Sequence, residues 1–416
     1  MNEELRIKGE KAREAAYILA NYNSEKKNSL LQAMADALEK DAEKICCANE
    51  RDMTEARSKG TSVALLDRLL LTSDRVKDMA DGLRAVASLP DPVGEVLGAW
   101  KGAQDLEIGK VRVPLGVIGI IYEARPNVTA DAAGLCLKAG NAVLLRGGSE
   151  AINSNKAIVA VLANAVEEVG GPSGAIQLVE NPSREVATEM MKMNQYLDVL
   201  IPRGGKGLIQ HVLENATVPV IETGTGNCHI YVDESADLAK AEEIVINAKC
   251  QRPGVCNAVE TLLVHRNVAE EFLPKVGKKL VGLGVEIRAD EASLPLLPEA
   301  KPVTEIDYET EFLDLILAVK LVDSFEEATD HIRKYGTKHS EAILTESYSN
   351  AQRFLQLVDA AAVYVNASTR FTDGFQFGFG AEIGISTQKL HARGPMGLKE
   401  LTSTKYIIKG NGQFRD

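Results

Sequence analysis

The sequence lacks the long apolar runs of a membrane protein. No stretch approaches the roughly 18 consecutive apolar residues that a spanning helix needs, and the first residues contain no apolar segment typical of a secretory signal. Acidic residues outnumber basic ones, which gives a formal net charge of −12 and argues against a general binder of nucleic acid. We therefore expect a cytoplasmic protein with no membrane and no nucleic-acid partner.

Cysteine and histidine are also scarce, since each occurs only six times in 416 residues. The cysteines form no C-x-x-C pair, and the histidines show no spacing typical of zinc ligands. In a large cytoplasmic chain the thiols are expected to stay reduced. The sequence thus predicts neither a metal site nor a disulfide framework.

The patterns that are present predict an α/β protein of two or three domains. Apolar residues recur at helical spacing through residues 3–90. Continuous apolar runs then alternate with helical segments, which is typical of parallel sheets covered on both faces. The expected strands of the first series lie at 117–122, 142–145, 175–179, 197–201 and 218–221.

Two further segments read as exposed strands. Residues 104–113 alternate around Gly109 and Lys110, and this predicts a hairpin turn at those two residues. The tail at 402–410 alternates in the same way. Because an isolated edge strand invites pairing with another subunit, we expect the tail to serve association.

Two glycine-rich turns follow predicted strands, where ligands bind in parallel sheets. Their residues are Arg146, Gly147, Gly148 and Ser149 after the second strand, and Arg203, Gly204 and Gly205 after the fourth. Glycines let a backbone approach a phosphate, and arginine adds charge. Glycine is equally common in such turns for steric reasons, so both interpretations stay open. No G-x-G-x-x-G follows the first strand, so this is not the standard dinucleotide motif.

Cys256 lies in a Gly/Pro turn just before the apolar run 261–264, with Arg252 nearby. A turn at the edge of a sheet can present a nucleophile to a substrate, and a nearby cation lowers the pKa of a thiol. A lone cysteine is nevertheless more often an inert, buried apolar residue. This segment alone leaves a nucleophilic and an inert cysteine as alternatives.

Across nearly the whole chain, the order of these segments resembles the aldehyde dehydrogenase superfamily. The resemblance rests on residues 114–117 (Pro-Leu-Gly-Val), 140–143 (Gly-Asn-Ala-Val), 222–224 (Glu-Thr-Gly) and 254–256 (Gly-Val-Cys). Glu222 and Cys256 lie 34 positions apart (256 − 222), which matches the family's spacing between its glutamate and its nucleophile. The resemblance therefore implies that Cys256 is catalytic.

Three longer motifs, at residues 122–127, 322–343 and 377–398, resemble the γ-glutamyl phosphate reductase branch of that superfamily. The implied reaction is the NADPH-dependent reduction of L-glutamate 5-phosphate to L-glutamate 5-semialdehyde, with release of phosphate, through a Cys256 thioester, in L-proline biosynthesis. No kinase domain precedes these motifs. We therefore expect a free-standing reductase that is functionally coupled to a separate glutamate 5-kinase.

The resemblance also implies a domain plan within an aldehyde dehydrogenase-like α/β fold. A Rossmann-type NADP(H)-binding domain is expected at 1–102 and 117–226, and an α/β catalytic domain at 227–390. A small β oligomerisation element is expected at 103–116 and 391–416, so the protein should be a homo-oligomer.

Carried over residue by residue, the resemblance implies a catalytic set of Cys256, Glu222 and Asn127. Hydrolytic family members use their glutamate to activate water, which a reductase does not need, so a proton-transfer role and a structural role of Glu222 are equal alternatives. The family's Pro-Trp-Asn turn is replaced here by residues 123–127, where Asn127 could donate to the oxyanion. Arg125 suits the acyl phosphate or carboxylate, with a surface turn arginine as the alternative, and Arg370 is a candidate for the substrate's α-carboxylate.

The cofactor implied by the resemblance is NADPH/NADP. Arg146 replaces the family's ribose-binding lysine, and Ser149 replaces an acidic residue that favours a free ribose hydroxyl. Keeping a cation and losing a carboxylate favours a 2′-phosphate. Glu311 maps near the family's nicotinamide-ribose carboxylate, with a solvated loop residue as its alternative. The two glycine-rich turns complete the expected cofactor site.

Two other functions are alternatives to this one. A hydrolytic NAD-dependent aldehyde dehydrogenase lacks the reductase-type motif at 322–343 and needs no phosphate. A catalytically dead dinucleotide-binding or scaffold protein would not need Cys256, and its cysteine would resist acylation at pH 7. Phosphate dependence and acylation of Cys256 distinguish the three.

Overall fold

The computed structural model describes residues 2–123 and 125–415, which belong to two compact units. Unit 1 falls within residues 1–223, 378–384 and 396–416, and unit 2 within residues 224–377 and 385–395. The chain therefore passes from unit 1 to unit 2 after Thr223 and crosses between the units again near its C-terminal end. No helix in the described part of the chain is long and apolar enough to cross a membrane.

Unit 1 begins with helices, as the spacing of its apolar residues predicts. Its helices are α1 (Glu3–Leu19), α2 (Ser24–Lys40), α3 (Ala42–Ser58), α4 (Val63–Leu69), α5 (Ser73–Ser88), α6 (Asn127–Lys138), α7 (Ile152–Glu168), α8 (Arg184–Met190) and α9 (Lys206–Asn215). Side-chain caps fix several of their starts, because the first N–H groups of a helix have no partner within it. The Thr72 hydroxyl accepts the N–H of Arg75 at 3.2 Å and so caps the start of α5.

The sheet of unit 1 is parallel, and its strand order is β5-β4-β3-β6. The strands are β3 (Val117–Tyr122), β4 (Ala142–Arg146), β5 (Ile176–Leu178) and β6 (Val199–Arg203). Every residue of β3 is buried, as expected of a strand between covering helices. The strand predicted at 218–221 is wrong, because that segment makes only a single bridge, between Leu200 and Val220. Pro219 lacks the N–H that a regular ladder would need there.

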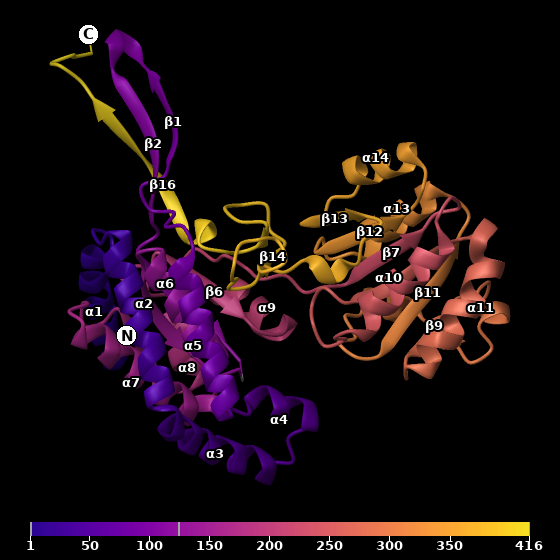
Figure 1. Cartoon of the computed structure of the whole chain (residues 1–416), viewed down its shortest axis with the longest axis horizontal. Coiled ribbons are helices and arrows are strands. Elements are labelled where there is room, and N and C mark those ends of the chain that lie inside the picture. The colour runs from indigo at the N-terminus through magenta and orange to yellow at the C-terminus, as the bar shows by residue number, and fades with distance from the viewer. Residues whose placement is uncertain (1, 124, 416) are drawn as a thin grey trace. The chain divides into compact units, whose positions relative to one another are not determined.

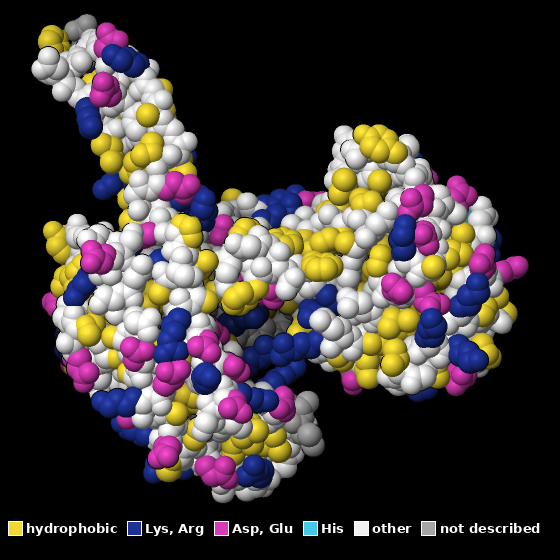
Figure 2. Space-filling model, in the orientation of Figure 1, with side chains coloured by type: hydrophobic (Ala, Val, Ile, Leu, Met, Phe, Trp, Pro, Cys, Tyr) yellow, Lys and Arg dark blue, Asp and Glu magenta, His cyan; other side chains and the backbone are white. Residues whose placement is uncertain are grey.

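A three-stranded antiparallel arm extends from unit 1 (Figure 1). It consists of β1 (Val96–Lys101), β2 (Glu107–Pro114) and β16 (Thr402–Lys409) in the order β1-β2-β16. The hairpin turn predicted at Gly109 and Lys110 is wrong, because both residues pair inside β2. The chain turns instead at Gln104 and Asp105, which both have left-handed φ angles. Apolar side chains are exposed along this arm (Figure 2).

Unit 2 is a second α/β unit whose main sheet is parallel throughout, with the order β10-β9-β11-β8-β7-β12-β13. Its strands are β7 (Cys228–Val232), β8 (Val259–His265), β9 (Glu286–Ala289), β10 (Lys301–Pro302), β11 (Ile316–Val322), β12 (Ser340–Leu344), β13 (Ala362–Val365), β14 (Ile385–Ser386) and β15 (Gly394–Pro395). Strands β14 and β15 form a small antiparallel pair of their own. The helices are α10 (Leu238–Cys250), α11 (Arg266–Gly282), α12 (Glu305–Glu309), α13 (Phe325–Tyr335) and α14 (Tyr348–Leu357).

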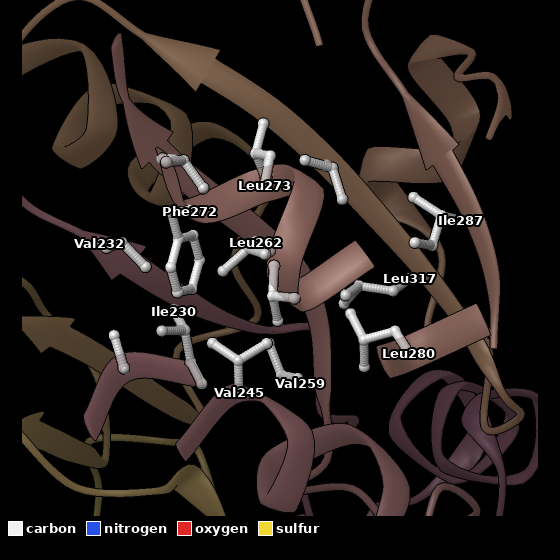
Figure 3. Packing of buried hydrophobic residues seen from close by; sticks show 14 of the residues in the cluster. Ile230, Val232, Val245, Val259, Leu262, Phe272, Leu273, Leu280, Ile287 and Leu317 are labelled. Carbon is white, nitrogen blue, oxygen red and sulfur yellow. The ribbon is translucent and has the colours of Figure 1, made fainter. Parts of the chain in front are cut away.

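Alternate residues of these strands feed two apolar cores on opposite faces of the sheet. Ile230 and Leu262 pack with α10 and α11 on one face (Figure 3). Tyr231 and Leu263, their neighbours in sequence, pack with α13 and α14 on the other. The central strands β7 and β8 are therefore packed on both faces and rigid. They restrict the movement of the segments that lead into them.

Candidate active site

Cys256 lies in the loop that joins α10 to β8. Pro253 and Gly254 separate the helix from the strand, because proline has no N–H to continue a helix, and Val255 accepts the N–H of Ala258 at 3.1 Å to close a turn. The Cys256 side chain is half-buried. The loop therefore presents a thiol at the entrance of a buried strand, as the sequence predicts.

The backbone of Cys256 rests against the segment that enters β7. A Cβ atom at Gly226 would lie 1.4 Å from the carbonyl oxygen of Cys256, so only glycine fits at position 226. The Cys228 thiol donates to the same carbonyl oxygen, with 3.2 Å between sulfur and oxygen. The N–H of Gly226 donates to Glu311 Oε1 at 2.6 Å, so the carboxylate of Glu311 orders this contact.

Asn257, the residue after Cys256, ties the loop to Arg370. The Asn257 amide donates to the carbonyl of Thr372 at 2.9 Å, and its Oδ1 atom accepts a hydrogen bond from the Arg370 guanidinium. The Arg370 Nε atom donates to Gln251 Oε1 at 2.8 Å. Burial and the nearby charge of Arg252 lower the pKa of Arg370, while Asp373 and Cys256 oppose that effect. A guanidinium is thus fixed beside the candidate nucleophile by Asn257, a residue that was not among the predicted site residues.

The thiols around Cys256 differ from one another in environment. Burial raises the pKa of Cys228 well above its usual value, and burial also raises the pKa of Cys250. Both thiols are therefore kept protonated near neutral pH. Cys228 contacts His339 Nδ1 at 3.9 Å, and that nitrogen also lies 2.8 Å from the Ser340 hydroxyl. Cys228 thus acts as a buried donor beneath the loop of Cys256.

The glycine-rich turn after β4 lies in unit 1 and has the features of an anion cradle. A Cβ at Gly147 would lie 2.1 Å from the Asn155 Nδ2 atom, so the backbone of Gly147 lies close to the Asn155 side chain and leaves no room for a side chain at position 147. Within the described part of the chain, Asn155 Nδ2 and Arg146 Nε are buried donors without a hydrogen-bond partner. Arg146 Nη2 donates to the carbonyl of Pro182 at 2.6 Å, and burial lowers the pKa of Arg146. These donors fit the phosphate or ribose of a nicotinamide cofactor.

Gly148 and Ser149 continue this turn toward α7. Gly148 is buried, whereas Ser149 is exposed at the start of a short 3-10 turn that leads into the helix. The small, exposed hydroxyl of Ser149 leaves the rim of the turn without a carboxylate at that position.

The glycine-rich turn after β6 contacts a side chain of this same chain, the carboxylate of Glu123. The carboxylate of Glu123 accepts the N–H of Gly205 at 3.0 Å, and a Cβ at Gly204 would lie 2.6 Å from the Glu123 carboxyl carbon. A side-chain carboxylate therefore stabilises the N-terminus of α9, where negative charge is favourable. Arg203 is half-buried at the end of β6. Glu123 was not predicted in this role, because Glu123 and Gly205 lie 82 positions apart.

The remaining candidates also divide between the units. Asn127 is exposed in the first turn of α6 and donates to Asp131 Oδ2 at 3.2 Å. Arg125 and Glu222 are half-buried, and both belong to unit 1, whereas Cys256, Glu311 and Arg370 belong to unit 2. Ala124 of the 122–127 motif lies outside the described residues. Among the described residues, no group of three or more histidine, cysteine, aspartate or glutamate side chains could hold a metal ion.

Comparisons with known proteins show what this chain is similar to. The model of the aldehyde dehydrogenase family matches residues 2–294. Gamma-glutamyl phosphate reductase of Heliobacterium modesticaldum is 66% identical over 412 residues, and that of Moorella thermoacetica 64%, with 99% of each chain covered. The crystal structure of gamma-glutamyl phosphate reductase from Thermotoga maritima has a TM-score of 0.97 and 52% identity over the full length of both chains. An acetylating aldehyde dehydrogenase from Geobacillus thermoglucosidasius is 19% identical, and its structure matches with a TM-score of 0.71 over 100% of this chain and 98% of that chain, which indicates a shared fold.

Proposed function

This chain belongs to the aldehyde dehydrogenase family, and from that premise we propose that it reduces L-glutamate 5-phosphate with NADPH. The products are L-glutamate 5-semialdehyde, phosphate and NADP⁺, and the step belongs to L-proline biosynthesis. The predicted aldehyde dehydrogenase-like α/β fold and the resemblance to the γ-glutamyl phosphate reductase branch are confirmed. The protein is therefore an oxidoreductase that uses a nicotinamide cofactor.

One observation carries the assignment of Cys256 as the nucleophile. Its backbone is clamped by Gly226 and Cys228, while the next residue, Asn257, holds the guanidinium of Arg370. A rigid loop thus offers a thiol together with a cation. An acyl phosphate substrate with an α-carboxylate needs both, because arginine binds carboxylate and phosphate oxygens with paired N–H donors.

The proposed chemistry begins with attack of the Cys256 thiolate on the acyl carbon. The carbon–oxygen bond to phosphate breaks, phosphate leaves, and a thioester to Cys256 remains, so that one difficult step becomes two easier ones. When bound, the nicotinamide cofactor supplies the hydride that reduces the thioester carbon. Cys256 then departs as a thiolate, and the aldehyde is released.

Asn127 and Glu222 complete the proposed catalytic set. The amide of Asn127 would donate to the oxyanion, which requires it to leave its hydrogen bond with Asp131. One such donor is typically worth about 3–4 kcal/mol. Glu222 is proposed to transfer protons rather than to activate water, since reduction consumes no water. We further propose that Arg125 contacts the phosphate and Arg370 the α-carboxylate.

The preference for NADPH over NADH is proposed to arise at the turn after β4. Arg146 supplies the cation there, Gly147 and Gly148 allow close approach of the backbone, and position 149 carries a hydroxyl in place of a carboxylate. Together these features favour a 2′-phosphate. We propose that Arg203, Gly204 and Gly205 contribute a second contact with the cofactor. Glu311 is proposed to reach the nicotinamide ribose.

The cellular setting follows from the same premise. We propose a cytoplasmic homo-oligomer assembled through the arm of β1, β2 and β16. The substrate is the product of glutamate phosphorylation, so functional coupling with a separate glutamate 5-kinase is expected.

The decisive experiment is the reverse assay on wild type, Cys256→Ala and Cys250→Ala. Reduction of NADP⁺ to NADPH, coupled to oxidation of glutamate semialdehyde, is followed with and without phosphate. The assay is repeated with NAD⁺. We expect phosphate-dependent turnover with NADP⁺ preferred, a loss of about 10³-fold or more in Cys256→Ala, and near-normal rates in Cys250→Ala. Turnover that ignores phosphate would instead indicate a hydrolytic NAD-dependent aldehyde dehydrogenase, and activity that survives in Cys256→Ala would exclude the thioester.

A further inference from the structure

A buried ion pair joins the two ends of the loop that carries Cys256. Lys249 lies in the last turn of α10, and Glu260 is the second residue of β8. The Lys249 Nζ atom lies 2.6 Å from Glu260 Oε2 and 3.1 Å from the carbonyl oxygen of Val259. Both side chains are fully buried. The ion pair therefore links the two ends of the loop that contains Cys256.

The Lys249–Glu260 pair lies next to the apolar core of unit 2. Val259, the neighbour of Glu260, packs with Val245 and Leu317 in the apolar core of unit 2 (Figure 3). Burial raises the pKa of Glu260 to about 7, and the charge and hydrogen bond of Lys249 oppose that effect. Well-packed apolar residues often stabilise a core at least as well as a buried ion pair does. Global stability alone therefore does not account for charges at this position.

Glu260 also organises the segment that lies against Cys256. Its second oxygen, Oε1, accepts the N–H of Leu313 at 3.2 Å. Leu313 has a φ of 55°, a left-handed conformation that is unfavourable for leucine and persists only where the surroundings impose it. Two residues earlier, Glu311 accepts the N–H of Gly226, the residue that rests on the Cys256 carbonyl. Glu260 thus braces the Cys256 loop directly and, through this segment, also braces the backbone against which Cys256 rests.

We propose that the Lys249–Glu260 pair is a positioning device that holds Cys256 in its reactive placement. The two charged groups fix both ends of the loop, and Glu260 fixes Leu313 and thereby the Glu311–Gly226 contact. Neither Lys249 nor Glu260 contacts the substrate in this proposal. The proposal rests on the proposed function only in taking Cys256 as the nucleophile.

The test replaces the pair by apolar residues of similar size in Lys249→Met/Glu260→Leu. The double variant should unfold near the temperature of wild type, because no unpaired charge is left in the core. We nevertheless expect alkylation of Cys256 by iodoacetamide at pH 7, followed by peptide mass spectrometry, to slow about tenfold. The kcat of the reverse reaction should fall about 10–100-fold, as a small displacement of a reacting group can cause, while KM changes little.

Glu260→Gln is the second variant, because it retains the size of Glu260 and one carbonyl acceptor. We expect smaller losses of the same kind in this variant. Lys275→Met/Glu271→Leu is the matched control, since it removes an exposed lysine–glutamate pair of α11 with a separation of 3.0 Å and should leave alkylation and kcat unchanged.

Wild-type alkylation and kcat in a folded double variant, or in folded Glu260→Gln, would overturn the proposal. The alkylation assay needs no substrate, so this result is independent of the proposed function. Full turnover in Cys256→Ala would instead overturn the proposed function.

Discussion

At the scale of single residues, the contact between Gly226 and Cys256 is the most restrictive feature of the candidate site. Any side chain at position 226 would overlap the backbone of Cys256, since its Cβ would fall 1.4 Å from the carbonyl oxygen. The segments that carry these residues lead directly into the buried strands β7 and β8, so neither segment can move far without disturbing the packed sheet. The placement of Cys256 is therefore set by the absence of a side chain at a neighbouring position.

Gly226→Ala should displace the Cys256 loop and reduce kcat about 100-fold. Overpacking of this kind should also cost about 1–3 kcal/mol of unfolding free energy. Steady-state kinetics of the reverse reaction and chemical denaturation measure the two effects. Gly282→Ala is the control, because no atom lies within 4 Å of a Cβ there and alanine is favoured in a helix. Wild-type kcat in Gly226→Ala would show that the contact does not control the nucleophile.

The sequence predicted the turn of Cys256 but not the residues that hold it. A cysteine between a helix and an apolar strand is visible in sequence, because the helix, the Gly/Pro break and the strand are all local. Asn257 bonds Arg370 across 113 positions, and Gly226 bonds Glu311 across 85. Such hydrogen bonds form only when distant segments of the chain meet in the fold, so no local sequence pattern predicts them. A polar amide directly after a candidate nucleophile was the one available signal, and it pointed to Asn257.

At the scale of elements, the parallel strands were predictable where burial on both faces produced continuous apolar runs. The alternating segment at 104–113 marked a real strand, β2, yet its turn was misplaced. Alternation reports which residues share a face, but turn position depends on backbone conformation, which Gln104 and Asp105 adopt without glycine. The burial of His331 of α13 among aromatic rings was not predicted, because the rings of Tyr308 and His229 come from distant parts of the chain.

Helix α13 should make the protein sensitive to mild acid through His331. This side chain packs edge-on against Tyr308 and His229, at ring distances of 4.8 and 5.5 Å. Burial, assisted by the charge of His229, lowers the pKa of His331 to about 2. The unfolded chain binds a proton below about pH 6.5, whereas the folded protein does not. The stability contributed by neutral His331 is therefore complete above that pH and is lost as the pH falls toward 2.

Between pH 7.5 and 5, wild type should lose about 2 kcal/mol more unfolding free energy than His331→Gln loses. Urea denaturation across that range measures the difference, and the Gln variant cannot titrate. His211→Gln removes an exposed histidine of α9 and should follow the wild-type curve. Parallel pH curves for wild type and His331→Gln would contradict the assigned pKa.

At the scale of the whole molecule, the arm of unit 1 exposes apolar side chains that a single chain does not cover. Trp100 and Ile408 both pair with Ile108, so the three side chains share one face of the arm. Trp100 is 47% exposed and Ile408 58% exposed. A thin sheet with a bare apolar face is marginal in water. We therefore expect a second copy of the chain to cover it, which agrees with the proposed homo-oligomer.

Ile408→Lys should shift this assembly toward smaller species. A buried lysine replaces an apolar contact, and a loss of about 2 kcal/mol at an interface corresponds to about a 30-fold weaker Kd. Light scattering coupled to size exclusion, over a dilution series, would show the shift as a lower mass at equal concentration. Tyr348→Lys is the control, because Tyr348 is 80% exposed on α14 of unit 2, away from the arm's strands in sequence and sheet. An unchanged mass for Ile408→Lys, or a monomeric wild type at all concentrations, would show that the arm does not drive association.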